Sequence, residues 1–259
     1  MTTRTRYPVG AFCWVGLATS DCAAAQDFYA QLLDWECEVL AAGGTGTFTI
    51  LRRAGEDVAI LYRQTAQARA AAAPPHWTSY ISVQDAEATA ARAAELGGAK
   101  VFRTPFDVLD AGRIAAIRDP TGAILSLWQP RGRIGASVVN EFGALCWNEL
   151  ATTDVDCARS FFGELVGWTY DTDDAGYTTI TNAGRRIGGI RQQAMDERDA
   201  LPAWLPHFEV ESTEAVTRRA TELGAREAGS IPETALGRRA VIADPQGASF
   251  AVLEPAQDT

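Results

Sequence analysis

The chain has 259 residues, of which 47% are hydrophobic, so it is long enough to bury a core in each of two ordinary domains. Its formal net charge of −10 opposes binding to nucleic acid, and its longest apolar runs are too short to span a membrane. Five cysteines without CxxC spacing, and no apolar stretch suited to a signal peptide near the start, predict reduced thiols and a cytoplasmic protein.

The first predicted strand, residues 14–18, leads through Ser20 and Asp21 into a helix with Phe28, Leu32 and Leu33 on one face. Three short strand-like segments follow, including 47–51 and 58–62. A second strand at 79–83 then precedes an alanine-rich helix at 85–96, and further strands are expected at 101–102, 114–118 and 124–128. The order strand, helix, strands therefore occurs twice within the first 130 residues.

The same order returns in the second half of the chain. CWVGLATSD at 13–21 reappears as CWNELATTD at 146–154, and the LLDW ending at Trp35 matches the LVGW ending at Trp168. Near the end of each half, Asp119-Pro120-Thr121-Gly122 matches Asp244-Pro245-Gln246-Gly247. A shared order over so many residues indicates an internal duplication. We therefore predict one domain over residues 7–130, a linker over 131–139 and a second domain over 140–255.

These motifs, CW…L.T.D, the aromatic pair on the first helix and DP.GA, resemble those of the vicinal oxygen chelate superfamily. That superfamily includes glyoxalase I, extradiol dioxygenases and bleomycin-resistance proteins. Within it, the sequence more closely resembles the tandem glyoxalase/bleomycin-resistance-like proteins of actinobacteria. The resemblance implies an α+β fold of tandem glyoxalase-like domains. Each domain is expected to contain two βαβββ modules that form a curved mixed sheet around a cleft for a small molecule, in a monomer or homodimer.

In metal-using members of that superfamily, histidine or glutamate ligands lie on strands that face the cleft. The corresponding positions in this sequence are Trp14, Trp147, Thr78, Leu205, Ser126 and Ala251. None of these side chains suits a His-rich centre, and the whole chain has only His76 and His207. The resemblance therefore predicts a cleft with no metal, and no cofactor-binding motif is found. His76, between prolines and a tryptophan, is expected on the surface.

Alternation along the strands assigns side chains to the cleft of the second half, because neighbouring residues on a strand point to opposite faces. If Phe208 faces the helices, His207 and Glu209 face the cleft. If Leu150 faces the helices, Glu149 faces the same cleft. We therefore expect an imidazole and two carboxylates on one concave surface.

Glu149, His207 and Glu209 are the candidate catalytic residues. A carboxylate beside a histidine can set the imidazole tautomer and raise its basicity, as general acid/base catalysis requires. The alternative is structural: Glu149 hydrogen-bonds a neighbouring strand or lies in water, and His207 is an ordinary histidine at a strand entrance.

The candidate ligand-binding residues are aromatic: Trp14, Tyr80, Trp128 and Trp147. On a concave surface these rings can stack on a flat ligand, or they can simply fill the cavity. Trp35 and Trp168, just after the first helix of each half, are expected in the core instead.

Three functions follow from this pattern. The first is a metal-independent enzyme that acts on a small aromatic or polyketide-like metabolite by acid/base chemistry, as an isomerase, cyclase or lyase. The second is non-catalytic binding that sequesters such a molecule, as in antibiotic resistance. The third, a metal-dependent dioxygenase, hydroxylase or glyoxalase, rests on the resemblance alone. The imidazole and acids expected in only one of the two clefts favour the enzyme.

Overall fold

The computed structural model describes residues 3–41, 46–197, 200–229 and 236–256. The first half contains β1 (Phe12–Thr19), α1 (Cys22–Leu33), β2 (Glu36–Ala41), β3 (Thr47–Arg53), β4 (Glu56–Arg63), α2 (Ala66–Ala70), β5 (His76–Ser82), α3 (Ala86–Glu95), β6 (Lys100–Val108), β7 (Gly112–Arg118) and β8 (Ile124–Pro130). The second half contains β9 (Leu145–Thr152), α4 (Val155–Val166), β10 (Thr169–Thr172), β11 (Thr178–Asn182), β12 (Arg185–Gln192), η1 (Met195–Glu197), β13 (Ala203–Glu209), α5 (Thr213–Glu222), β14 (Arg226–Gly229), β15 (Gly237–Ala243) and β16 (Ser249–Pro255).

The two halves form two open eight-stranded sheets with the same strand order. The first sheet is β2-β3-β4-β1-β5-β8-β7-β6, and the second is β10-β11-β12-β9-β13-β16-β15-β14. In each sheet the first strand pairs in parallel with the fourth and antiparallel with the fifth. The predicted α+β fold of two βαβββ modules in each half is therefore confirmed. None of the described helices is long and apolar enough to cross a membrane.

Local capping explains where the first helix of each half begins and ends. The carboxylate of Asp21 accepts a hydrogen bond from the amide of Ala24 at 3.1 Å, and Asp154 caps α4 in the same way. The helices end at Asp34 and Gly167, both in the left-handed conformation. The chain then turns sharply, which directs the tryptophan that follows each helix into the core.

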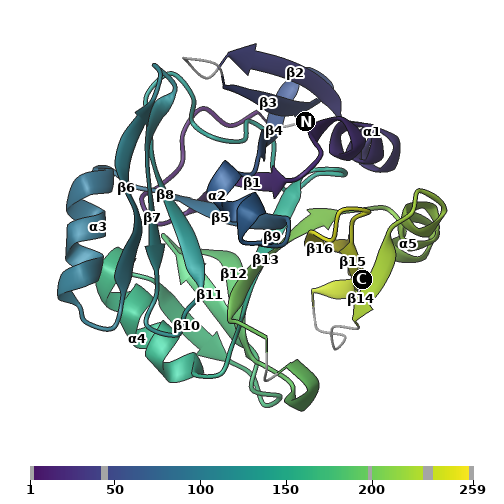
Figure 1. Cartoon of the computed structure of the whole chain (residues 1–259). Coiled ribbons are helices and arrows are strands. Elements are labelled where there is room, and N and C mark those ends of the chain that lie inside the picture. Colours follow the sequence, from purple (N-terminus) through teal and green to yellow (C-terminus); the bar gives the residue numbers. More distant parts are fainter. Residues whose placement is uncertain (1–2, 42–45, 198–199, 230–235, 257–259) are drawn as a thin grey trace.

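The two sheets pack through the faces that carry the helices. In Figure 1, α3 and α4 lie together at one side of the molecule and α1 and α5 at the other, and both pairs are in contact. One core cluster joins Trp35 and Phe28 of the first half to Phe208 of the second, and another joins Phe12 to Trp168. The two tryptophans are therefore core residues, as predicted, and each core is shared between the halves. This leaves the opposite, concave face of each sheet for side chains that do not contact helices.

Candidate functional site

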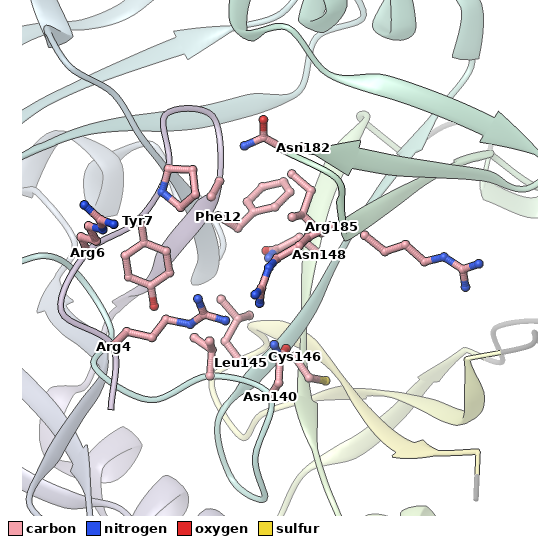
Figure 2. Close-up of a pocket in the computed structure, with 15 residues that line it drawn as sticks. Arg4, Arg6, Tyr7, Phe12, Asn140, Leu145, Cys146, Asn148, Asn182 and Arg185 are labelled. Carbon is pink, nitrogen blue, oxygen red and sulfur yellow. The ribbon is translucent and has the colours of Figure 1, made fainter. Parts of the chain in front are cut away.

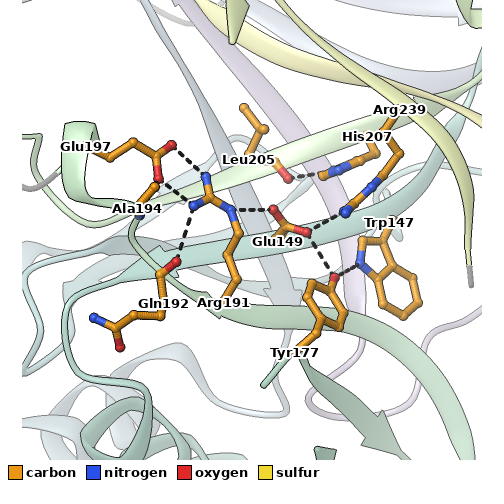
Figure 3. Close-up of polar contacts among 10 residues, drawn as sticks. All are labelled: Trp147, Glu149, Tyr177, Arg191, Gln192, Ala194, Glu197, Leu205, His207 and Arg239. Atoms are coloured by element: carbon orange, nitrogen blue, oxygen red, sulfur yellow. Dashed lines mark hydrogen bonds and ion pairs between the residues drawn. The ribbon is translucent and has the colours of Figure 1, made fainter. Parts of the chain in front are cut away.

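The concave face of the second sheet carries a buried polar network centred on Glu149 of β9. Its Oε2 lies 2.5 Å from Nη1 of Arg239 on β15, and its Oε1 lies 2.9 Å from Nε of Arg191 on β12. The hydroxyl of Tyr177, just before β11, donates to Oε2 at 3.0 Å, and Figure 3 shows these side chains converging on the carboxylate. Two strands and the turn before a third therefore supply donors to one carboxylate that is 1% exposed.

The network extends outward to Glu197 in η1. Two guanidinium nitrogens of Arg191 contact its carboxylate at 2.5 and 2.8 Å (Figure 3). The network therefore contains two carboxylates, Glu149 and Glu197, and two guanidinium groups, Arg191 and Arg239. Their charges sum to zero. Such balance lets the charged groups remain buried, because each charge has an opposite charge and hydrogen bonds to replace water.

Glu149 remains ionised in this setting. Burial alone raises its pKa, but the positive charges of Arg239 and Arg191 oppose it, and the net effect lowers the pKa below its usual value. At neutral pH we therefore expect a carboxylate whose lone pairs are already engaged. Such a group serves as a fixed negative charge and is a poor proton acceptor.

His207 of β13 is fully buried beside this network and is neutral at neutral pH. Burial lowers its pKa to about 4, against the charge of Glu149, which raises it. Its Nδ1 lies 3.1 Å from the carbonyl oxygen of Leu205, which favours the tautomer with the proton on Nδ1 (Figure 3). Nε2 then carries the lone pair, and it has no hydrogen-bond partner among the described residues. A buried acceptor of this kind is costly unless a ligand or water meets it.

This arrangement differs from the expectation that a carboxylate beside His207 would set its tautomer and raise its basicity. His207 and Glu149 lie close enough to interact electrostatically, but the imidazole is oriented by donating its Nδ1–H to the Leu205 carbonyl, and the pKa of His207 falls instead of rising. Burial causes this difference, since it penalises the charged imidazolium more than one nearby carboxylate favours it.

Glu209 is not part of the network. It lies with Phe142, Glu211 and Glu254 around a separate hollow of about 180 Å³ at the end of β13. Burial and the charge of Glu141 raise its pKa. Its side chain makes no described hydrogen bond to Glu149 or His207, so the structure brings together two of the three predicted catalytic residues.

Trp147, the aromatic residue predicted in the second cleft, is linked to the same network. Its indole Nε1 donates to the hydroxyl of Tyr177 at 2.9 Å, and that hydroxyl in turn donates to Glu149. Gly189 of β12 gives the Tyr177 ring its space, because a Cβ at this glycine would lie 2.0 Å from the tyrosine oxygen. The second concave face therefore combines two aromatic rings, one ionised acid and one neutral imidazole.

Both halves also match known family models. Residues 11–127 match the model described as Glyoxalase/Bleomycin resistance protein/Dioxygenase superfamily, and residues 146–253 match the one described as Glyoxalase-like domain. The chain is 37% identical over 265 residues to CFP32 of Mycobacterium tuberculosis, covering 99% of each chain. It belongs to the glyoxalase/bleomycin resistance protein/dioxygenase superfamily.

Two other proteins extend the comparison. The anthracycline biosynthesis protein DnrV of Streptomyces peucetius is 33% identical over 264 residues, which cover 96% of this chain and 95% of DnrV. Among solved structures, the 2,3-dioxygenase LapB of Pseudomonas sp. KL28 superposes with a TM-score of 0.64 at 14% identity, covering 95% of this chain and 92% of LapB. The second likeness shows the shared fold alone.

The side chains of the second concave face do not fit the metal centre that many members of the superfamily use. Trp147 stands at one ligand position, and the ionised Glu149 is already bound by two guanidinium groups. A cation there would have to compete with two positive charges already in place. Among the described residues no cluster of three histidine, cysteine, aspartate or glutamate side chains could hold a metal ion.

The concave face of the first sheet is filled by its own side chains. Trp14, Tyr80 and Trp128 form one buried cluster, in which the two tryptophan rings meet edge to face at 5.4 Å. Gly16 occupies the repeat position that holds Glu149 in the second half, and the Tyr80 ring fills the space a side chain there would need. The three predicted ligand-binding aromatics are thus together, as expected, but with almost no exposed surface.

The linker also helps to fill the concave face of the first sheet. Ala136 packs into the aromatic cluster, and its amide donates to the carbonyl of Cys13 at 2.8 Å. The carbonyl of Arg133 accepts the indole N–H of Trp128 at 3.0 Å, and the guanidinium of Arg133 pairs with Asp57 of β4. The segment between the two halves therefore serves as part of the first domain's core.

Sequence reasoning missed four residues of the polar network: Arg191, Arg239, Tyr177 and Glu197. Strand alternation could have found both arginines, because each lies an odd number of residues from a core isoleucine on its strand: Arg191 is next to Ile190, and Arg239 is three residues before Ile242. Tyr177 lies in a turn outside the regular strands, where alternation assigns no face. Of the two histidines, His76 is exposed, as predicted.

Proposed function

We propose that the chain acts, without a metal, on a small aromatic or polyketide-like metabolite through acid/base chemistry at the concave face of the second sheet. The observation that carries the proposal is Nε2 of His207, a buried acceptor with no partner among the described residues. A hydroxyl or an acidic C–H of a ligand would meet that acceptor. Isomerisation, cyclisation or elimination are the reaction types that such a proton transfer serves.

The surroundings of His207 support an aromatic ligand. Trp147 and Tyr177 present rings on the same face and are held by hydrogen bonds, so stacking on them costs little side-chain entropy. The likeness to an anthracycline biosynthesis protein also supports a metabolite with fused aromatic rings. Since His207 is shielded from solvent, the proposal requires a side chain of this face to move when the ligand enters.

The proton balance is simple. Nε2 of His207 takes a proton from the metabolite, and the same imidazolium returns it at another atom, so no external acid or base is consumed. The ionised carboxylate of Glu149 stabilises the transient imidazolium, as the opposing effect of Glu149 on the pKa of His207 indicates. Arg191 and Arg239 keep Glu149 ionised and positioned throughout.

A second function, binding without chemistry, is favoured by one specific observation. The pKa of His207 is about 4, so the free protein presents a weak base at neutral pH. A weak base with a fixed orientation still accepts a hydrogen bond well. In this reading Trp147 and His207 hold a ligand that leaves unchanged.

One experiment separates the two functions. Purified protein is titrated with a panel of anthracyclines and simpler aromatic polyketides by tryptophan fluorescence, and the recovered ligands are analysed by mass spectrometry. The variant is His207→Gln, and His76→Gln is the matched control because His76 is exposed. Catalysis predicts that His207→Gln abolishes product while affinity falls only modestly, and that His76→Gln changes neither.

Three other outcomes would contradict catalysis by His207 or the absence of a metal. Ligand recovered unchanged from the unaltered protein supports sequestration. Product formation that survives His207→Gln contradicts the proposed acid/base role. Activity that a chelator removes and a divalent metal restores contradicts the metal-free mechanism.

A further inference from the structure

A large hollow lies between the N-terminal segment and the second sheet, away from the concave faces. Its volume is about 910 Å³, within the range of roughly 300–1,000 Å³ typical of small-molecule sites. One wall is the segment of Arg4 to Phe12, and the other is formed by β9 and the start of β12 (Figure 2). It therefore sits where the two halves meet.

The charge of this hollow is opposite to that of the chain as a whole. Its lining contains four arginines and no acidic residue, namely Arg4, Arg6, Arg185 and Arg186, although the chain carries a formal net charge of −10. Within the described part of the chain, none of these four guanidinium groups forms an ion pair. Four like charges without counter-charges repel one another, and a bound anion would relieve that repulsion.

A buried amide adds a polar group to the same wall. Asn148 of β9 is 1% exposed, and its Oδ1 accepts a hydrogen bond from the hydroxyl of Ser79 at 2.6 Å. Its Nδ2 donates to no other group among the described residues. An amide N–H at this position suits an oxygen atom of a ligand.

The rest of the lining is apolar and aromatic. Tyr7, Phe12, Leu145 and Ile187 cover the hollow between the arginines. The walls are also fixed: the amide of Asn182 donates to the carbonyl of Val9 at 2.9 Å. A ligand that matches both features has a flat apolar body and a negatively charged group.

We propose that this hollow binds a small aromatic anion, with its carboxylate or phosphate group held by Arg4 and Arg185 and its ring against Tyr7 and Phe12. Arg185 pairs with Asn182 in the β11–β12 hairpin, so both side chains lie on the face of the sheet that forms the hollow. Asn148 lies on the same strand as Glu149 but points to the opposite face. The anion site is therefore separate from the His207 site.

The test uses three naphthalene probes that differ only in their polar group: 2-naphthoate, 2-naphthyl phosphate and the neutral 2-naphthamide. Binding to the full chain is measured by isothermal titration calorimetry at low salt and at about 150 mM salt. We expect both anions to bind at least about 10-fold more tightly than the amide, and more weakly as salt rises. Whichever anion binds more tightly shows whether the hollow prefers a carboxylate or a phosphate.

Two double variants carry the same loss of charge. Arg4→Gln with Arg185→Gln should weaken binding of both anions at least about 10-fold. Arg69→Gln with Arg226→Gln changes two exposed arginines outside the hollow and should leave binding unchanged. His207→Gln should also leave it unchanged, which locates the probe away from the concave face.

The proposal is overturned if neither anion binds, or if the neutral amide binds as tightly as the anions. It is also overturned if the two double variants lose affinity equally, since binding would then reflect net charge alone. Loss of binding in His207→Gln would assign the probe to the concave face instead. Thermal unfolding of each variant verifies that the compared proteins are folded.

Discussion

The carboxylate of Glu149 and the guanidinium of Arg239 form a 2.5 Å ion pair in which both side chains are only 1% exposed. Removing one partner from a buried pair leaves a charge that water cannot solvate, which costs about 3 kcal/mol. We therefore expect Arg239→Gln to lower the free energy of unfolding by about that amount in urea at pH 7. The control is Arg238→Gln, the exposed arginine beside it, which should change stability by less than about 0.5 kcal/mol. Equal losses in both variants would mean that the ion pair contributes nothing specific.

Gly189 determines where the ring of Tyr177 can lie. A Cβ at this position would lie 2.0 Å from the tyrosine oxygen, so Gly189→Ala must displace the ring and its hydrogen bond to Glu149. Overpacking of this kind costs about 1–3 kcal/mol, measurable by chemical unfolding. Gly163→Ala is the control, because the nearest atom to its Cβ is at 3.6 Å in a helix, where alanine is favoured. If Gly189→Ala leaves the free energy of unfolding unchanged, the Tyr177 ring is not confined by this glycine.

The buried imidazole of His207 should make stability depend on pH. Burial lowers its pKa from 6.5 to about 4, so between these values the unfolded chain binds a proton that the folded chain does not. The free energy of unfolding therefore falls as pH falls, by about 2 kcal/mol between pH 7 and pH 5 from this group.

That part of the pH dependence should disappear in His207→Gln and persist in His76→Gln. Urea unfolding of the three proteins at pH 7 and pH 5 gives the comparison, since all other titrating groups are shared. Parallel pH profiles for all three would contradict the assignment of the effect to His207.

The polar atoms of the duplicated core are all hydrogen-bonded at Tyr29, but within the described part of the chain two of their counterparts near Phe162 are not. The hydroxyl of Tyr29 receives a hydrogen bond from Trp77 at 3.0 Å and donates one to Asp244 at 3.1 Å. At the repeat position stands Phe162, and there Nε1 of Trp204 and Oδ2 of Asp119 have no partner among the described residues. The missing hydroxyl explains both unsatisfied atoms.

Adding that hydroxyl should stabilise the protein. We expect Phe162→Tyr to raise the free energy of unfolding by about 1 kcal/mol, and Tyr29→Phe to lower it by at least as much. Differential scanning calorimetry reports both as opposite shifts of the melting temperature. A lower melting temperature for Phe162→Tyr would mean that the core at α4 has no room for the added atom.

Much of the fold could be predicted from the sequence because its signals are local or repeated. Capping by Asp21 and Asp154 sets the helix starts, and alternation assigns Leu150 and Phe208 to the core, as the structure confirms. Alternation also put Glu149 on the concave face. The repeat itself predicted two sheets of equal order without any knowledge of their packing.

The candidate site could be predicted only in part. Alternation states which face a side chain occupies but not which strand brings a partner to it. Arg191 and Arg239 are 42 and 90 residues from Glu149, and only strand order places them beside it. Glu209 differs because it is the last residue of β13 and bridges to Phe142, beyond the start of β9 at Leu145, so its side chain lies past the end of the network.

The duplication, the element order and the chemical character of each strand face follow from the amino-acid sequence, since these depend on residues close together in the chain. The three-dimensional packing was needed to show that the linker completes the first core and that Glu149 is neutralised by two arginines. It was also needed to show that four arginines line one hollow between the halves. The physical reason is that burial and charge pairing depend on neighbours in space, and packing of the two sheets brings those neighbours together from distant parts of the chain.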